Sequence, residues 1–245
     1  MNMTVRLAVA VLLTVLMGYV GAMAQEQVTW KAVLVAGDDS VPVFENAVTT
    51  LSGQLRQRGV TDIRVLSASP RASRSEMRAT ARNLDVALRS LNIGANDGCL
   101  LYFTSHGAEI GLLMSQDKDN QQNLSPEIMG RIVNEYCTGR PAVVVVSACH
   151  SGTFLRDGVV ADDRIVLTAA RKERVSFGCE FRLRYNYFDG CLLAEIDRSM
   201  TWADLFRRTK ACIERLEAGL NEKPSEPQAA FGEKVKNLPL PRAGQ

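Results

Sequence analysis

Three residues in the chain carry side chains suited to nucleophilic chemistry: Cys149, His150 and His106. Cys149 and His150 follow the apolar run VVVVSA, and His106 follows the apolar run LLYFTS. A thiol that a neighbouring imidazole deprotonates is the nucleophile of cysteine hydrolases. The chain holds 2 histidines, so the partner of a reactive Cys149 is either His106 or His150.

Strand order favours His106 over His150 as that partner. The apolar strand that ends at His106 and the one that ends at Cys149 are joined by a single crossover with one helix, and such crossovers place their strands side by side. Neighbouring strands lie about 5 Å apart, so we predict that the two residues face each other at the carboxyl edge of a sheet. Adjacent residues of an extended segment point in opposite directions. His150 is therefore expected to point away, as a rim or partly buried histidine.

Small residues follow both chemical groups and agree with a catalytic role. Gly107 allows a sharp turn after His106 and leaves its N–H open, and this N–H and that of Cys149 could bind an oxyanion. The bland alternative is that Cys149 is a buried small hydrophobe and His106 a hydrogen-bonded loop residue. We prefer catalysis because both residues stand at strand ends before small residues.

The rest of the chain reads as one α/β domain. Short continuous apolar runs alternate with segments of helical periodicity, which predicts a parallel sheet covered by helices on both faces. Strands are expected at 31–37, 63–68, 97–107, 141–149 and 164–170, with a short hairpin strand at 111–114 and a weak last strand at 229–235. Helices are expected at 43–59, 73–91 (capped by Ser73 or Ser75), 125–137 and 201–219.

The first residues predict export. Residues 1–24 combine a basic start at Arg6, an apolar run and a small-x-small end at 22–24, which is the pattern of a cleaved secretory signal peptide. The alternative is a membrane anchor that is kept, but the apolar core is short for that. We expect one mature domain at 25–245 with a loose tail at 237–245, no stable membrane span after cleavage, and a periplasmic or secreted location.

Charge and cysteine content narrow the partners. The net charge of +2 and the scattered basic residues do not predict a nucleic-acid surface. Of the 6 cysteines, Cys179 and Cys191 are the first pair to test as a disulfide, and Cys99 is expected to be a buried small hydrophobe. If Cys149 stays free, at least one more cysteine is unpaired. No zinc site is expected, because neither histidine stands at ligand spacing from cysteines.

The two motifs resemble a known peptidase family. The stretches YFTSHG and VVVVSACHSG are similar to the catalytic motifs of caspase-hemoglobinase-fold cysteine peptidases, and the chain resembles the legumain-like C13 peptidases, especially exported bacterial members. The stretches VLVAGDDSVPVFENAV and RIVLTAARKERVSFGC resemble further segments of that family. The resemblance implies a three-layer fold with a mostly parallel sheet of about six strands, a polypeptide substrate, and no metal or organic cofactor. It also implies an acyl-enzyme on Cys149, His106 as general acid and base, and oxyanion-hole amides from Gly107 and Cys149.

Specificity does not carry over with the motifs. Legumains have Asp where this chain has Ser105, an acid where it has Ser147, and an Arg after the first strand where it reads AGDDS. An acid-rich pocket would favour a basic or polar side chain before the cleaved bond, although for each aspartate taken singly we prefer the reading that it caps a turn or helix. The residues we expect around the substrate pocket are Asp38, Asp39, Ser147, Ser176, Phe177 and Asp189.

Two alternatives to a cysteine endopeptidase stay open. One is a non-catalytic exported binding protein that keeps the peptidase fold, and the other is a transamidase that uses the same dyad. A serine hydrolase of the α/β type is not expected, because the chain has no GxSxG motif.

Overall fold

The computed structural model describes residues 28–69, 77–117 and 120–243. The signal peptide expected at 1–24 and the caps expected at Ser73 or Ser75 lie outside these ranges. No helix within the described residues is both long and apolar enough to span a bilayer.

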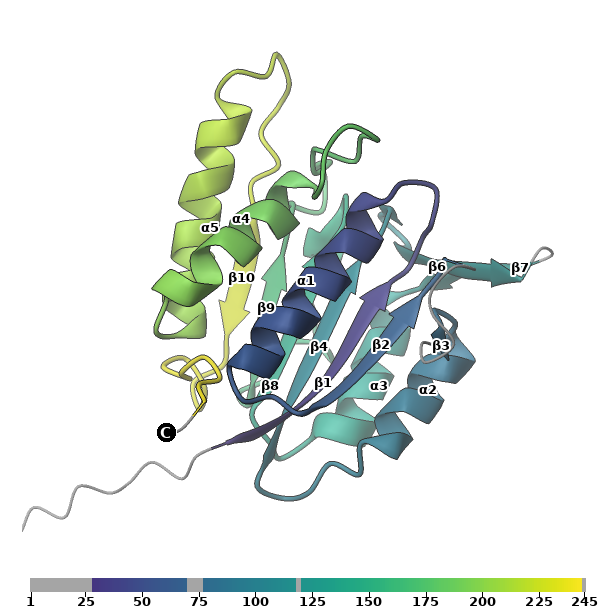
Figure 1. Cartoon of the computed structure of the whole chain (residues 1–245), viewed down its shortest axis with the longest axis vertical. Helices are drawn as coiled ribbons and strands as arrows, with labels where there is room; N and C mark the ends of the chain where they lie inside the picture. Colours follow the sequence, from purple (N-terminus) through teal and green to yellow (C-terminus); the bar gives the residue numbers. More distant parts are fainter. Residues whose placement is uncertain (1–27, 70–76, 118–119, 244–245) are drawn as a thin grey trace, which may run out of the picture.

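Seven strands of the described chain form one twisted sheet in the order β10-β9-β8-β4-β1-β2-β3 (Figure 1). Every neighbouring pair is parallel except β10 with β9. This confirms the mostly parallel α/β sheet. The strands are β1 (Thr29–Ala36), β2 (Asp62–Ser67), β3 (Met77–Arg78), β4 (Asp97–Thr104), β8 (Ala142–Ser147), β9 (Arg164–Thr168) and β10 (Gln228–Phe231).

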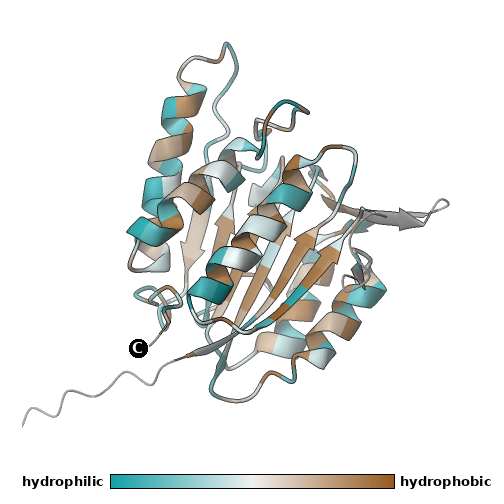
Figure 2. Cartoon of the chain, viewed as in Figure 1, coloured by the Kyte–Doolittle hydropathy of each residue, from teal (hydrophilic) through white to brown (hydrophobic). Residues whose placement is uncertain are grey.

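Helices cover both faces of the sheet, which gives three layers (Figure 1). The apolar side chains of the strands divide into two clusters: one packs with α1, α4 and α5, and the other with α2 and α3. The central strands are mostly apolar (Figure 2), in keeping with burial on both faces of the sheet. The helices are α1 (Val43–Gln57), α2 (Ala81–Ser90), α3 (Pro126–Cys137), α4 (Tyr187–Glu195) and α5 (Trp202–Glu217), with short 3-10 turns η1 (Ser151–Phe154) and η2 (Ile196–Arg198).

A small antiparallel sheet stands beside the carboxyl end of β4. It consists of β5 (Gly107–Ala108), β6 (Gly111–Asp117) and β7 (Asn120–Leu124). The sequence predicted the start of β6 as a hairpin strand, and the structure adds β7 as its partner. Because β5 begins directly after His106, this hairpin fixes the backbone on one side of the histidine.

Two helices differ from the sequence prediction. The helix expected at 73–91 begins at Ala81, because Met77 and Arg78 pair with β2 as an extended strand and the Thr80 hydroxyl caps the helix by accepting from the Asn83 N–H. Helix α4 was not predicted. Its residues are apolar on nearly every side, so the sequence shows no alternation of polar and apolar faces there.

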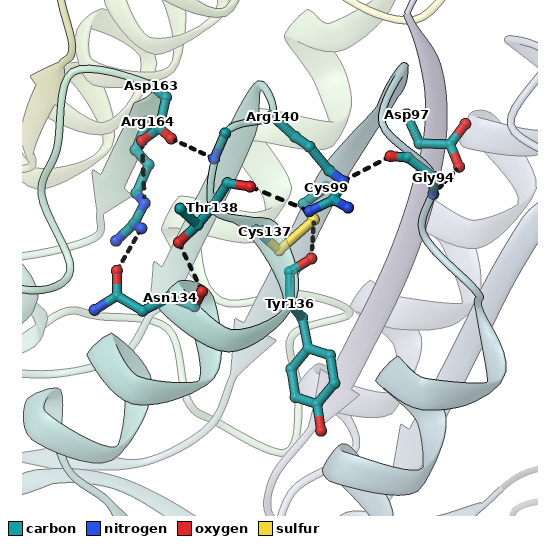
Figure 3. Close-up of a disulfide and its surroundings, with 11 residues drawn as sticks. Gly94, Asp97, Cys99, Asn134, Tyr136, Cys137, Thr138, Arg140, Asp163 and Arg164 are labelled. Atoms are coloured by element: carbon teal, nitrogen blue, oxygen red, sulfur yellow. Dashed lines mark hydrogen bonds and ion pairs between the residues drawn. A yellow bond between two sulfur atoms is a disulfide. The ribbon is translucent and has the colours of Figure 1, made fainter.

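The cysteine prediction was wrong about the pairs. The disulfides join Cys99 to Cys137 and Cys191 to Cys212, and Cys149 and Cys179 are free. Figure 3 shows the first bond, which joins the start of β4 to the last residue of α3. The crossover explains it, since α3 returns the chain to the edge where β8 begins beside β4.

The tail expected to be loose is packed against the domain. Leu238 and Leu240 are buried. The Trp202 N–H donates to the Leu238 carbonyl at 3.2 Å, and the Leu240 N–H donates to the Met200 carbonyl at 3.0 Å. Two buried leucines and two backbone hydrogen bonds thus hold residues 238–240 against the core cluster that contains α5.

Candidate active site

The carboxyl ends of β4 and β8 bring Cys149 and His106 to the same edge of the sheet. The ladder between the two strands ends at the pair Thr104 and Ser147, and the Ser105 N–H donates to the Ser147 carbonyl at 3.1 Å. His106 and Cys149 each follow two residues after that last pair. Equal overhangs from directly paired strands therefore put the two residues at the same edge of the sheet.

Gly107 presses its backbone against the backbone of the cysteine. A side chain at this position would collide with the Cys149 carbonyl oxygen and come within 2.9 Å of the Ala148 Cβ. The Leu113 N–H donates to the His106 carbonyl at 2.9 Å, so Gly107 and its β6 partner Leu112 form a pair without mutual hydrogen bonds. The Gly107 N–H therefore points away from the hairpin.

The His106 ring is held by groups from the β1–α1 connection. Its Nε2 lies 3.2 Å from the Ser40 Oγ and 3.9 Å from an Asp38 carboxylate oxygen. The Ser40 hydroxyl and N–H both bond to that carboxylate, which makes a turn around it. The ring meets Phe44 of α1 edge to face, with 5.1 Å between ring centres. Contacts on Nε2 leave Nδ1 as the nitrogen that can act on a reacting group.

The Cys149 thiol is bordered by Ser176. The Ser176 N–H donates to the Cys149 Sγ at 3.3 Å, and the Sγ lies 3.6 Å from both the carbonyl oxygen and the hydroxyl of Ser176. The second free thiol, Cys179, is a different case. Burial, and after it the negative charge of Cys149, raise the pKa of Cys179 to about 12. A thiol that keeps its proton in this way is a poor nucleophile.

His150 is turned toward another part of the chain. Its backbone has φ of 57°, in the left-handed region, and its Nδ1 lies 2.9 Å from the Lys172 carbonyl oxygen. The ring is turned toward Lys172, as the sequence predicted, but the left-handed turn at His150 and not an extended backbone gives it this direction.

A buried polar cluster lies directly below the two strand ends. The Asp189 carboxylate is fully buried and accepts hydrogen bonds from the Tyr102 hydroxyl at 2.5 Å, the Thr104 hydroxyl at 2.6 Å and the Asn186 amide at 2.7 Å. The same amide donates to the Ser147 hydroxyl at 3.1 Å. Thr104 and Ser147 are the last ladder pair, so this cluster supports the edge that carries both candidate residues.

The comparison with known proteins decides the family. Residues 75–214 match the model of the Peptidase C13 family, which is more than half of the 245 residues. The chain belongs to the Peptidase C13 family. No curated protein matches the sequence. Among solved structures, caspase-1 from Spodoptera frugiperda superposes with a TM-score of 0.61 at 13% identity, over 85% of this chain and 90% of that one, which confirms the caspase-like fold.

Family and fold together support a cysteine peptidase in general. Within this C13 chain, the predicted pocket residues fall into two groups. Ser176, Asp38, Asp39 and the half-buried Phe177 lie at or near the surface. Ser147 and Asp189 are enclosed by protein, 1% and 0% exposed, and both are hydrogen-bonded to Asn186 below the rim. We therefore place these two beneath the site and not on its wall.

The structure also adds a residue that the sequence analysis missed. Ser40 links Asp38 to His106, and neither periodicity nor a motif marks this serine, because it lies in an irregular turn. For Asp38 the geometry favours contact with the histidine over the pocket role that the sequence suggested. Among the described residues, no group of three or more His, Cys, Asp or Glu side chains is arranged to hold a metal ion.

The buried carboxylate of this C13 domain predicts an unusual dependence of stability on pH. Burial raises the pKa of Asp189 from 3.8 to about 6, against the lowering effect of its hydrogen-bond donors. Since the folded carboxyl holds its proton more tightly than the unfolded one, its contribution to stability is full below pH 4 and is lost as the pH rises through 6. We expect Asp189→Asn to gain about 2 kcal/mol relative to the unsubstituted protein between pH 4 and pH 7.

Urea unfolding at pH 4.5, 5.5 and 7 measures this difference for the two proteins side by side. The comparison cancels the other carboxyl groups, such as Asp62 and Asp85, whose pKa values are lowered by hydrogen bonds and which act at lower pH. A difference between the two proteins that stays constant over this range would contradict the assignment.

Proposed function

We propose that this protein is an exported cysteine endopeptidase in which Cys149 attacks the carbonyl carbon of an internal peptide bond. The observation that carries the proposal is the equal overhang of His106 and Cys149 beyond the last pair of β4 and β8. It places a thiol and an imidazole, which lie far apart in the sequence, at one edge of the sheet. Parallel sheets bind their substrates at this edge.

The proposed reaction begins with the thiolate of Cys149. Its sulfur forms a bond to the carbonyl carbon, and the oxygen takes the negative charge. The backbone N–H groups of Gly107 and Cys149 stabilise that charge, in keeping with the direction of the Gly107 N–H. His106 then gives its proton to the leaving amine, and the C–N bond breaks to leave an acyl-enzyme.

The second half of the reaction uses the same imidazole in reverse. Neutral His106 takes a proton from a water molecule, whose oxygen attacks the acyl carbon and releases the thiolate and the free acid. Ser40 and Asp38 hold the ring through Nε2, which leaves Nδ1 free to exchange the proton in this scheme. No step requires a group beyond this chain, its polypeptide substrate and water.

Export is supported by the cysteines. The two disulfides are bonds that persist in oxidising compartments and are rare in the cytosol. They agree with the signal peptide that the first residues suggest. We propose a periplasmic or secreted location for the mature domain.

Thiol labelling tests the catalytic dyad without knowledge of the substrate. We expect iodoacetamide at pH 7 to modify Cys149 at least about a hundredfold faster than Cys179, because a thiol that holds its proton is a poor nucleophile. His106→Gln should slow the modification of Cys149 by about tenfold or more. His150→Asn, which tolerates the left-handed backbone, should slow it far less.

Mass spectrometry of tryptic peptides distinguishes the two sites. Equal labelling of both free cysteines, or a rate at Cys149 that does not respond to His106→Gln, would favour the alternative of a binding protein that keeps the peptidase fold.

A further inference from the structure

The segment at residues 171–176, called the nucleophile loop below, is bonded to the turn that carries Cys149. The His150 N–H donates to the Arg174 carbonyl at 2.8 Å, and the His150 ring meets the Lys172 carbonyl. At the far end of the loop, Ser176 borders the Cys149 thiol. The position of this loop therefore sets the surroundings of the sulfur.

Behind the nucleophile loop lies a glutamate from a distant part of the chain. One Glu226 oxygen is 2.8 Å from the Arg171 guanidinium, and the other is 3.6 Å from that of Arg174. The preceding carbonyl, of Ser225, accepts the Arg171 N–H at 2.9 Å. The segment that follows α5 is thus joined to the nucleophile loop by a backbone hydrogen bond and by side-chain ion pairs.

The backbone of Glu226 is held in a conformation that its residue type disfavours. Its φ is 55°, in the left-handed region where glycine is at ease. Neighbours on both sides secure it: Ser225 and Pro227 are buried, and the Ser225 N–H donates to the Glu217 carboxylate at 2.9 Å. Strained residues of this kind persist where the surrounding structure determines them, and they gather at functional sites.

We propose that Glu226 is a positioning residue, which holds the nucleophile loop in register with Cys149 through Arg171 and Arg174. The inference rests on the proposed function and deepens it. Glu226 is 40% exposed and Arg171 38%, and ion pairs this exposed contribute little to stability. The two ion pairs of Glu226 instead fix the position of the nucleophile loop.

A second acid on the loop does not share this role. Glu173 lies 3.0 Å from the Arg171 Nε, but it belongs to the nucleophile loop itself. A contact within one loop cannot tie that loop to another element. Glu226 is the acid, among the described residues, whose ion pairs join the loop to the segment before β10.

The test uses the full mature protein and the variant Glu226→Gln, which keeps the side-chain shape and removes the charge. We expect kcat/KM for a peptide that the unsubstituted protein cleaves to fall by about tenfold, since small misplacements near a nucleophile have large effects on rate. We expect the melting temperature to move by less than about 2 °C. Hydrogen exchange at the His150 and Arg174 amides should become faster.

Controls separate position from charge. Glu222→Gln removes an exposed acid from the same segment and should leave all three measurements as they are. In a protein that already carries Arg171→Gln and Arg174→Gln, Glu226→Gln should cause little further loss of rate. The ion pairs that Glu226 would break are already absent there.

Two failures can be told apart. If the unsubstituted protein cleaves peptides and Glu226→Gln changes neither rate nor amide exchange, the inference is overturned and the proposed function stands. A large fall in melting temperature that accounts for the lost rate would also overturn it. If the unsubstituted protein cleaves nothing, but Glu226→Gln still accelerates exchange at the His150 and Arg174 amides, the positioning role of Glu226 is supported and the proposed function fails.

Discussion

Cys149→Ala is expected to abolish peptide cleavage, with a fall in kcat of at least about 10⁴-fold. Alanine removes the sulfur that forms the acyl-enzyme and leaves its surroundings in place. Cys149 is in neither disulfide, and the side chain is only partly buried, so the fold should tolerate the change. Cleavage of a mixed peptide library, read by mass spectrometry, measures the effect and reports the preferred bond.

Cys179→Ala is the matched control for this variant. It removes the other free thiol, which the proposed reaction does not use, and should keep the cleavage pattern of the unsubstituted protein. If the Cys149 variant and the unsubstituted protein cleave equally, or if neither cleaves any peptide in the library, the endopeptidase proposal is wrong.

Gly107→Ala should have the second largest effect, a loss of about 10² to 10³-fold in kcat. The new methyl group would overlap the Cys149 carbonyl oxygen and press on Ala148, so the turn after His106 has to move away from the nucleophile. The same displacement turns the Gly107 N–H away from the oxyanion. Binding of the substrate should weaken less than the chemical step, because the oxyanion exists only beyond the ground state.

Gly53→Ala is a glycine control of opposite character. Gly53 lies inside α1, and a side chain there would meet nothing within 4 Å. Alanine in a helix interior should stabilise the protein by about 1 kcal/mol and leave kcat unchanged. Steady-state kinetics and thermal unfolding of both variants measure these effects. A fully active Gly107→Ala protein would show that the Gly107 N–H has no part in the reaction.

The pairing of His106 with Cys149 could be predicted because it depends on connection rules and not on side-chain detail. A strand, one helix and a second strand leave little choice about which strands meet, and two residues at matching strand ends follow from that. The buried strands were clear for the same reason, since both faces of the sheet select apolar residues.

The failed predictions and the missed residue depend on contacts between segments distant in the sequence, and no local sequence pattern marks such contacts. Cys191 bonds to Cys212 because α4 and α5 lie side by side, and α4 itself shows no polar face in the sequence. Ser40 reaches His106 from an irregular turn. Asp189 looks like a pocket acid until the hydroxyls of Tyr102 and Thr104 are seen to enclose it.

The ladder between β4 and β8 has a consequence for heat inactivation. The two strands are hydrogen-bonded directly, with no other element between them, so His106 and Cys149 separate only when the middle of the sheet comes apart. The nucleophile loop is joined to the domain by exposed ion pairs and a few backbone bonds. On warming, peptide cleavage, which needs the loop that ends at Ser176, should therefore be lost at a lower temperature than the reactivity of the Cys149 thiol toward a small alkylating agent.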